Sequence, residues 1–283
     1  MRYLALATDY DGTIAIDGQM PVEAVAGIAR LRKSGRRAIL VTGRRLDQLL
    51  AVCPQIDLFD YVVAENGALV YAPRTRVETL LGKPPLAEFI ERLRSLGVDG
   101  VEVGRVIVST WLPNHIAVLQ AIQEMGLEFH VIFNRAAVMV LPAGVNKVTG
   151  LDYALRKLVL SFHETVGIGD AENDYSFLER CECAVAVANA VPSIRQLAAF
   201  VTQREAGQGV AELIDELIAD DLARIEGKLA QHFITVGLRA DGTAVAVPPY
   251  GVNRSPAPPG AASPLWHRHC GAPYRAELSG LRY

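Results

Sequence analysis

The sequence lacks a surplus of charge of either sign, and it lacks a long apolar run. It has 28 Lys and Arg residues against 31 Asp and Glu residues, a formal net charge of −3. Without a net basic field, binding to nucleic acid or to an anionic membrane would need a local patch. No apolar run approaches the ~20 residues of a membrane span, and the N-terminus lacks the three-part layout of a signal peptide. We therefore expect a cytoplasmic protein that binds no nucleic acid directly and no membrane.

Cysteine is scarce and irregularly spaced. The four residues are Cys53, Cys181, Cys183 and Cys270. Cys181 and Cys183 have the spacing of half a metal site, but no second pair and no nearby histidine completes it. We expect reduced, mostly buried thiols rather than a disulfide framework or a zinc site.

Apolar residues are abundant. They make up 51% of the chain, against 21% charged residues, which allows a sizeable core and excludes global disorder. In the first 75 residues, predicted buried strands at 3–9, 37–42 and 61–64 alternate with predicted amphipathic helices at 21–33 and 46–52. This alternation predicts a parallel sheet with helices on both faces.

Residues 76–142 break this alternation. They contain two predicted helices at about 84–96 and 113–125, a valine-rich stretch at 101–109, and two short strands at 128–133 and 137–141. The alternation then returns, with helices at 146–160, 173–180 and 192–199 and strands at 165–169 and 184–188. We predict an α/β core of residues 1–75 and 143–219, interrupted by a small α+β cap at 76–142.

The pattern changes again at about residue 220. Residues 220–253 predict a helix and β-hairpin extension, with the hairpin at 233–247 and its turn at Asp241-Gly242. Residues 254–283 are rich in Pro, Gly, Ala and Arg and show no period, so we expect this tail to be poorly ordered.

Acidic residues follow two of the predicted strands. Asp9 and Asp11 lead out of the first strand, and Asp170 and Asp174 follow the strand at 165–169. Open parallel sheets place their ligands at the carboxyl ends of the strands. The two clusters would repel one another there, and a divalent cation, most simply Mg²⁺, would relieve the repulsion. A calcium loop is disfavoured, because its twelfth position counted from Asp9 is Met20 rather than Glu.

Other residues at predicted strand and helix ends could bind an anion. Thr42, Gly43 and Arg44 close the second strand with a hydroxyl and with backbone N–H groups in a glycine turn. Lys147 opens the helix after the cap, where its ammonium could face the same strand ends. The residues alone leave open whether Asp9 or Asp11 is the nucleophile.

The order of these motifs resembles the haloacid dehalogenase superfamily of phosphohydrolases. Four motifs match, namely Asp9-x-Asp11-Gly12-Thr13, Thr42, Lys147 and Gly169-Asp170-x-x-Asn173-Asp174. The resemblance covers residues 1–215 and points to the branch with an α/β cap between the second and third motifs. That branch includes Cof-type sugar phosphatases, sucrose-phosphate phosphatases and archaeal phosphoglycolate phosphatases, and its larger Cof-type caps match less well.

The resemblance implies a Rossmann-like core and a role for each motif residue. Asp9 would be the nucleophile that forms an aspartyl-phosphate, and Asp11 would be the general acid and base. Mg²⁺ would be held by the Asp9 carboxylate, the Asp11 backbone carbonyl and Asp170, with Asp174 as a ligand or next to one. The phosphoryl oxygens would be neutralised by Thr42, Gly43, Arg44 and Lys147, and Asn173 would touch Lys147 or the phosphoryl group.

We therefore predict a magnesium-dependent phosphatase that hydrolyses a small phosphorylated metabolite, a sugar phosphate or a phosphoglycolate-like compound. Two alternatives remain open, a phosphomutase that transfers phosphate within its substrate and a regulatory module of a P-loop ATPase. The small cap predicts a leaving group of about three to six carbons. The cap offers Arg105, Ser109, Trp111, Asn114 and His115 as polar candidates for the substrate, although the position of His115 is more typical of a capping or surface residue. The sequence leaves open which of Arg105, Arg135 and His115 points inward, and Glu65-Asn66-Gly67 is expected to border the cleft.

The segment after residue 220 differs from what a standalone phosphatase of this superfamily is expected to contain. The segment up to Asn253 resembles the linker that precedes the phosphate-binding loop in proteins that fuse such a phosphatase to a HerA-type P-loop ATPase. Back-translation of residues 254–266, read from the third base of each codon, permits a Walker A loop ending in Gly-Lys-Ser-Thr. These observations predict a frameshifted tail and a P-loop ATPase encoded in the same gene or the next one.

Overall fold

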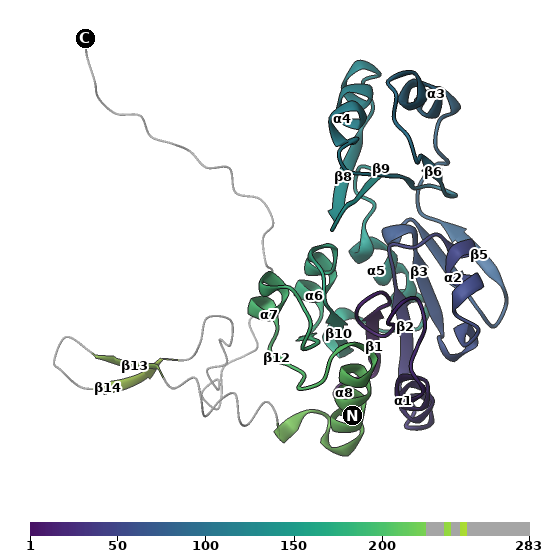
Figure 1. Cartoon of the computed structure of the whole chain (residues 1–283). Coiled ribbons are helices and arrows are strands. Elements are labelled where there is room, and N and C mark those ends of the chain that lie inside the picture. Colours follow the sequence, from purple (N-terminus) through teal and green to yellow (C-terminus); the bar gives the residue numbers. More distant parts are fainter. Residues whose placement is uncertain (225–234, 239–243, 248–283) are drawn as a thin grey trace, which may run out of the picture. The chain divides into compact units, whose positions relative to one another are not determined.

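The structure is a computed structural model that describes residues 1–224, 235–238 and 244–247. The chain forms two units, Met1–Leu229 and Ala230–Tyr283 (Figure 1). In the second unit, β13 (Thr235–Leu238) and β14 (Ala244–Val247) pair antiparallel, which confirms the strands of the predicted hairpin. Its expected turn at Asp241-Gly242 and the tail at 254–283 lie outside the described residues.

The first unit is built on an eight-stranded sheet with the order β12-β11-β10-β1-β2-β3-β4-β5. The strands are β1 (Ala5–Asp9), β2 (Arg37–Val41), β3 (Tyr61–Ala64), β4 (Leu69–Ala72), β5 (Val77–Leu80), β10 (Thr165–Gly169), β11 (Cys183–Ala186) and β12 (Phe200–Val201). The six strands from β12 to β3 are parallel, and every residue of the central strands β1 and β10 is buried. The predicted α/β, Rossmann-like parallel core is confirmed.

The last two strands of this sheet correct the expected boundary of the cap. β4 pairs antiparallel with β3, from which only a tight turn at Glu65–Gly67 separates it, and β5 pairs antiparallel with β4 after the four residues 73–76. β5 lies inside the range 76–142 expected for the cap, yet it belongs to the large sheet, so the core extends to Leu80. The pattern of this short, mostly exposed edge strand does not tell which sheet it joins.

Helices cover both faces of the large sheet (Figure 1). On one face lie α1 (Val22–Lys33), α2 (Leu46–Val52) and α8 (Ala206–Asp220), and on the other α5 (Lys147–Lys157), α6 (Tyr175–Arg180) and α7 (Pro192–Leu197). This division follows from right-handed crossovers that run in opposite directions away from β1. α1 and α8 pack closely at Gly27, where an added Cβ would lie 3.2 Å from Ile214 Cδ1.

The cap has a sheet and an apolar core of its own. Its four antiparallel strands have the order β6-β7-β9-β8 and are β6 (Glu102–Val103), β7 (Val108–Trp111), β8 (Phe129–Asn134) and β9 (Ala137–Pro142). Two helices, α3 (Ala87–Ser95) and α4 (His115–Glu124), pack on it. Phe89 of α3 meets Phe129 of β8 edge to face, with ring centroids 5.4 Å apart. The predicted α+β composition of this segment is confirmed.

Two further expectations concern single features. Cys53, Cys181 and Cys183 are buried, and Cys270 lies outside the described residues. Of the helices that the structure describes, none combines the length and the apolar character that crossing a bilayer requires.

Candidate active site

Three parallel strands bring the acidic motifs to one edge of the large sheet. Asp9 is the last residue of β1, Thr42 follows β2, and Asp170 follows β10. Because β1 pairs with both other strands in parallel, their carboxyl ends meet at this edge. Carboxylate oxygens of Asp9, Asp170 and Asp174 lie within 4.8 Å of one another. Three of the four acidic residues predicted to come together from two distant motifs therefore do so, and Asp11 is the exception.

Lys147 lies between two of these carboxylates. Its Nζ donates to Asp9 Oδ1 at 2.6 Å and to Asp174 Oδ1 at 2.5 Å, and its side chain is completely buried. The side chain starts at the first residue of α5, whose N-terminus is capped by Asn146 Oδ1 through the N–H groups of Val148 and Thr149. The hydrogen bonds from Asn146 at the N-terminus of α5 thus fix where the Lys147 ammonium group enters the site.

Backbone groups and glycines hold the other two carboxylates. Asp174 Oδ2 accepts from the N–H groups of Asp170 and Ala171, each at 3.0 Å. Asp170 Oδ1 accepts from the Thr13 hydroxyl at 2.9 Å. Gly12 has a φ of +80°, and a Cβ there would lie 2.4 Å from Asp170 Oδ2, so the motif needs glycine at this position.

Burial and mutual repulsion shift the proton affinities of these groups. Burial, and then the charge of Asp174, raise the pKa of Asp9 well above its usual range, although Lys147 opposes this. Burial and Asp174 likewise raise the pKa of Asp170 to about 6. Burial would lower the pKa of Lys147, but Asp174 and Asp9 outweigh it and raise this pKa above its ordinary value.

The donor set fits a hard divalent cation. The buried carboxylates of Asp9, Asp170 and Asp174 share one buried ammonium group, which leaves net negative charge in a place of low dielectric. Both oxygens of Asp174 already bind Lys147 and two backbone N–H groups. Asp9 and Asp170 are therefore the side chains best placed to hold Mg²⁺, with Asp174 orienting Lys147 beside them.

Asp11 lies apart from this cluster and pairs with Arg44. Arg44 Nε and Nη2 each donate to one carboxylate oxygen of Asp11 at 2.6 Å. The hydrogen bond to Asp11 raises the pKa of Arg44, although burial opposes it. Both side chains are partly exposed, so the pair lies at the mouth of the site rather than among the buried carboxylates. Arg44, expected to bind phosphate, is bound to Asp11 in this arrangement.

The predicted phosphate-binding turn follows β2. Thr42 is buried, and its hydroxyl accepts from the N–H of Arg44 at 3.1 Å. A Cβ at Gly43 would lie 3.8 Å from Asn173 Nδ2 and 4.0 Å from Asn66 Oδ1, so two amide side chains flank this glycine. Within the described part of the chain, Asn66 Oδ1 and Asn173 Oδ1 are buried without a hydrogen-bond partner. Buried polar atoms normally have a hydrogen-bond partner, so these two oxygens are acceptors that a bound ligand could use.

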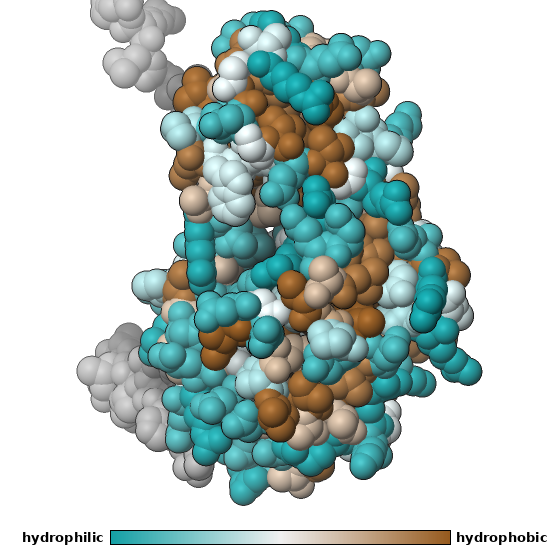
Figure 2. Space-filling view, turned by 45° about the vertical axis from the view of Figure 1, so that its right-hand side comes forward, coloured by the Kyte–Doolittle hydropathy of each residue, from teal (hydrophilic) through white to brown (hydrophobic). Residues whose placement is uncertain are grey.

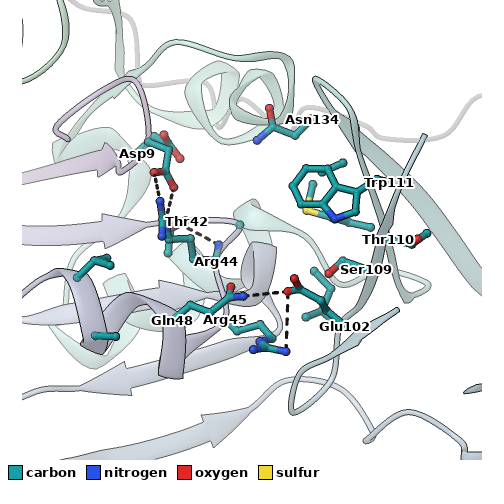
Figure 3. Close-up of a pocket in the computed structure, with 17 residues that line it drawn as sticks. Asp9, Thr42, Arg44, Arg45, Gln48, Glu102, Ser109, Thr110, Trp111 and Asn134 are labelled. Atoms are coloured by element: carbon teal, nitrogen blue, oxygen red, sulfur yellow. Dashed lines mark hydrogen bonds and ion pairs between the residues drawn. The ribbon is translucent and has the colours of Figure 1, made fainter. Parts of the chain in front are cut away.

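A cleft of about 550 Å³ opens between this edge and the cap. Asp9, Thr42 and Arg44 line its core side and Ser109, Trp111 and Asn134 its cap side, as Figure 3 shows. The space-filling view shows the same hollow between the cap at the top and the core below (Figure 2). Asn134 Oδ1 is another buried oxygen without a partner among the described residues.

The cap candidates from the sequence divide into two groups. Ser109 and Trp111 line the cleft as expected. The remaining residues have other partners: Arg105 faces Glu78 at 3.4 Å, Asn114 donates to Asp99 at 2.8 Å, and the His115 ring packs on Phe133. None of these three belongs to the residues that line the cleft, which agrees with the capping or surface role favoured for His115.

Other residues of the cleft escaped the sequence analysis. Asn134, Glu102 and Gln48 line it, and Gln48 Nε2 donates to Glu102 Oε2 at 2.9 Å. Arg135, a cap candidate from the sequence, lies in the turn after β8 and places its guanidinium Nη2 3.3 Å from Asp170 Oδ2. The place of Asn134 in the same turn between two predicted strands could have marked it as well, but nothing in the sequence says that this turn reaches the core.

Comparison with known proteins adds to this geometry. Residues 6–105 and 114–214 match the family of haloacid dehalogenase-like hydrolases. The chain belongs to this family. The phosphoglycolate phosphatase of Methanothermobacter thermautotrophicus is 31% identical over 216 residues, which cover 74% of this chain and 96% of that protein. The phosphoglycolate phosphatase of Pyrobaculum islandicum is 26% identical over 235 residues, covering 78% and 98%.

Solved structures share the fold of this hydrolase. A haloacid dehalogenase-like hydrolase from Bacteroides thetaiotaomicron aligns with a TM-score of 0.66 at 16% identity, over 76% of this chain and 99% of that one. A sugar phosphatase of haloacid dehalogenase subclass IIB aligns with a TM-score of 0.61 at 17% identity, over 75% and 98%. The expected superfamily, its fold and the assignment as a phosphatase are confirmed.

Proposed function

We propose that this phosphatase cleaves a small phosphomonoester by in-line attack of an Asp9 carboxylate oxygen on phosphorus. The observation that carries the proposal is the position of Asp9, which is buried at the end of β1, is bound by Lys147 at 2.6 Å and lines the cleft next to Thr42 and Gly43. The bond from phosphorus to the leaving oxygen breaks as the bond to Asp9 forms. Water then attacks the aspartyl-phosphate and releases phosphate.

Lys147 prepares Asp9 for this attack. The described residues offer the Asp9 carboxylate no hydrogen bond other than the one from Lys147 to Oδ1, which leaves Oδ2 to act as the nucleophile. Mg²⁺, held by Asp9 and Asp170, would supply positive charge for the phosphoryl oxygens. Thr42, the Gly43 N–H and Asn173 line the place where those oxygens would lie.

Asp11 would donate a proton to the leaving oxygen and later accept one from water. Both of its carboxylate oxygens accept from Arg44, so the proton transfer requires this pair to open. A substrate phosphate beside Arg44 offers the guanidinium a competing anion, which favours the opening. We therefore assign Arg44 to both partners in turn, Asp11 in the free enzyme and phosphate in the complex.

The cleft favours an uncharged leaving group that carries hydroxyl groups. The two cations that line it in the described part of the chain have carboxylate partners, Arg44 with Asp11 and Arg45 with Asp47 at 3.1 Å, so a substrate carboxylate would compete with these partners, although Arg45 Nε has no hydrogen-bond partner there. Asn134 Oδ1 is an unpartnered buried acceptor, and a hydroxyl would supply its missing donor. This chemistry supports a sugar phosphate. The names of the relatives instead support phosphoglycolate, whose carboxylate only accepts hydrogen bonds and so cannot donate to Asn134 Oδ1.

The test is phosphate release from purified protein. Activity on an aryl phosphate with Mg²⁺ should vanish with EDTA, and Asp9→Asn should abolish it while the circular-dichroism spectrum shows that the fold is retained. Full activity of Asp9→Asn would contradict the assignment of the nucleophile. Sugar phosphates should then exceed 2-phosphoglycolate by more than tenfold in kcat/KM, about 1.4 kcal/mol of discrimination. The reverse order would show that the cleft binds a carboxylate.

Two earlier alternatives stay hypotheses. A hexose 1-phosphate that is isomerised without release of free phosphate would identify a phosphomutase. A P-loop ATPase encoded downstream of residue 253 would support a regulatory role. The cytoplasmic location also stays a prediction.

A further inference from the structure

Glu65 connects the core to the cap through a buried carboxylate. It lies directly after β3, is 1% exposed, and reaches the loop that joins β6 to β7. Its Oε1 accepts from the Arg105 N–H at 2.8 Å, and its Oε2 accepts from Val106 at 2.8 Å and Ile107 at 3.0 Å. A carboxylate is the side chain suited to this loop, because it only accepts and all three partners donate.

The backbone of the same segment supports the phosphate-binding turn. The Glu65 N–H donates to the Arg44 carbonyl at 2.8 Å, and the Asn66 N–H donates to the Thr42 carbonyl at 2.9 Å. These two hydrogen bonds lie on either side of Gly43. In making them, Glu65 and Asn66 adopt left-handed conformations, with φ of 51° and 54°, which residues other than glycine rarely adopt. Such a pair persists only where its surroundings hold it.

Gly67 continues the segment against the helix that carries Lys147. Its φ is +105°, and a Cβ there would lie 1.8 Å from the Asn146 carbonyl oxygen and 2.8 Å from the backbone nitrogen of Lys147. Only glycine allows α5 to begin this close to the segment. Three consecutive residues therefore contact the cap loop, the phosphate-binding turn and the start of the Lys147 helix.

We propose that Glu65–Gly67 is a positioning segment that couples the seating of the cap to the phosphate-binding turn, with the Glu65 carboxylate as the link. When the loop at 104–107 is seated, its three N–H groups hold Glu65 in place. The left-handed backbone then keeps both hydrogen bonds to the turn and keeps Asn66 Oδ1 beside Gly43. This proposal depends on the proposed function in one respect, the assignment of the turn at Thr42–Arg44 as the phosphate-binding site.

Glu65→Gln tests the link in the full chain. Glutamine keeps the size of the side chain but turns an amide NH₂ toward at least one N–H donor. We expect the amides of Arg105–Ile107 and also those of Glu65 and Asn66 to exchange hydrogen at least tenfold faster. We also expect the dissociation constant for inorganic phosphate in the presence of Mg²⁺, measured by calorimetry, to be about tenfold higher. The kcat should be lower by about ten- to a hundredfold.

Glu212→Gln is the matched control, because the Glu212 carboxylate also accepts from backbone N–H groups, those of Gln203 and Arg204, within the core. It should leave phosphate binding and exchange at Glu65 and Asn66 unchanged. Gly104→Ala probes the link from the cap, since its Cβ would lie 2.7 Å from Glu65 Cδ, and it should reproduce the pattern of Glu65→Gln.

Hydrogen exchange and phosphate binding do not depend on turnover, so a protein without phosphatase activity still tests the coupling. The proposal is overturned if Glu65→Gln speeds exchange only at Arg105–Ile107 while phosphate binding stays within twofold of the wild type. Glu65 would then anchor the cap without positioning the turn.

Discussion

The large sheet carries buried or half-buried ion pairs at both of its ends, and the two ends differ in how fully their charge is neutralised. At the carboxyl ends of the strands, Asp9, Asp170 and Asp174 share the single buried ammonium of Lys147. At the amino ends, Asp221 meets the guanidinium of Arg36 at 2.8 Å. One end has an excess of buried negative charge, and the other is balanced.

Proton affinities express the same difference. Burial would raise the pKa of Asp221, but Arg36 and the backbone N–H of Arg2 lower it below its ordinary value. Burial and Asp174 instead raise the pKa values of Asp9 and Asp170. A carboxylate whose pKa is lowered by its partners stabilises the folded chain as an anion, whereas a carboxylate whose pKa is raised does so only with added positive charge. We infer that the balanced end serves stability and the unbalanced end serves ligand binding.

The largest expected effect comes from removing the one buried cation of the unbalanced end. Lys147→Ala leaves the Asp9 and Asp174 carboxylates buried without their partner, which should cost about 3–5 kcal/mol of unfolding free energy in EDTA. Activity should be lost as well. Urea unfolding and phosphate release measure both effects.

Lys157→Ala is the control on the same helix, because Lys157 is exposed near the end of α5. Its unfolding free energy should stay within about 0.5 kcal/mol of the wild type. A similar stability for both variants would show that the carboxylates are neutralised in another way, for example by protonation.

The next effect is the gain from metal. If Asp9 and Asp170 hold Mg²⁺, the ion binds the folded chain alone, and a concentration of one hundred times Kd should add about 2.7 kcal/mol of stability. Thermal unfolding with Mg²⁺ and with EDTA measures the gain. Asp170→Asn should lose most of it, whereas Asp221→Asn at the balanced end should keep it. An equal Mg²⁺ gain in Asp170→Asn would place the metal elsewhere.

The smallest effect is expected at the balanced end. Asp221→Asn removes the charge that binds Arg36 and should cost about 1–2 kcal/mol near neutral pH, with kcat/KM within twofold of the wild type. Because the folded pKa of Asp221 lies below its unfolded value, its contribution is complete above the unfolded pKa of about 3.9 and fades as the pH falls. The stability difference between wild type and variant should therefore shrink below that pH in urea titrations. A difference that grows on acidification contradicts the lowered pKa.

Several residues of the site could be predicted from the sequence because strand ends place them. Asp9 and Asp170 each follow a buried apolar run, and parallel strands must meet at their carboxyl ends. Lys147 and Thr42 could be assigned in the same way, since each stands at the boundary of a predicted element. For these residues, the local pattern already contains the information about their position.

Residues whose position depends on a contact between distant segments could not be predicted. Asn134 and Glu102 line the cleft because the cap packs above the strand ends, and neither stands in a motif. The range given to the cap was wrong at β5, because the partner of an exposed edge strand is chosen by the turn that precedes it.

By itself, the sequence determined the alternation of buried strands and amphipathic helices and thus the edge at which its acidic motifs meet. Periodicity and chain order are local properties, and parallel pairing converts them directly into position. Only the tertiary structure decided three contacts. Asp11 pairs with Arg44, Glu65 accepts hydrogen bonds from the loop at 104–107, and Arg105 forms an ion pair with Glu78. Each of these contacts joins segments far apart in the chain, where charge and hydrogen bonding choose a partner that no local pattern specifies.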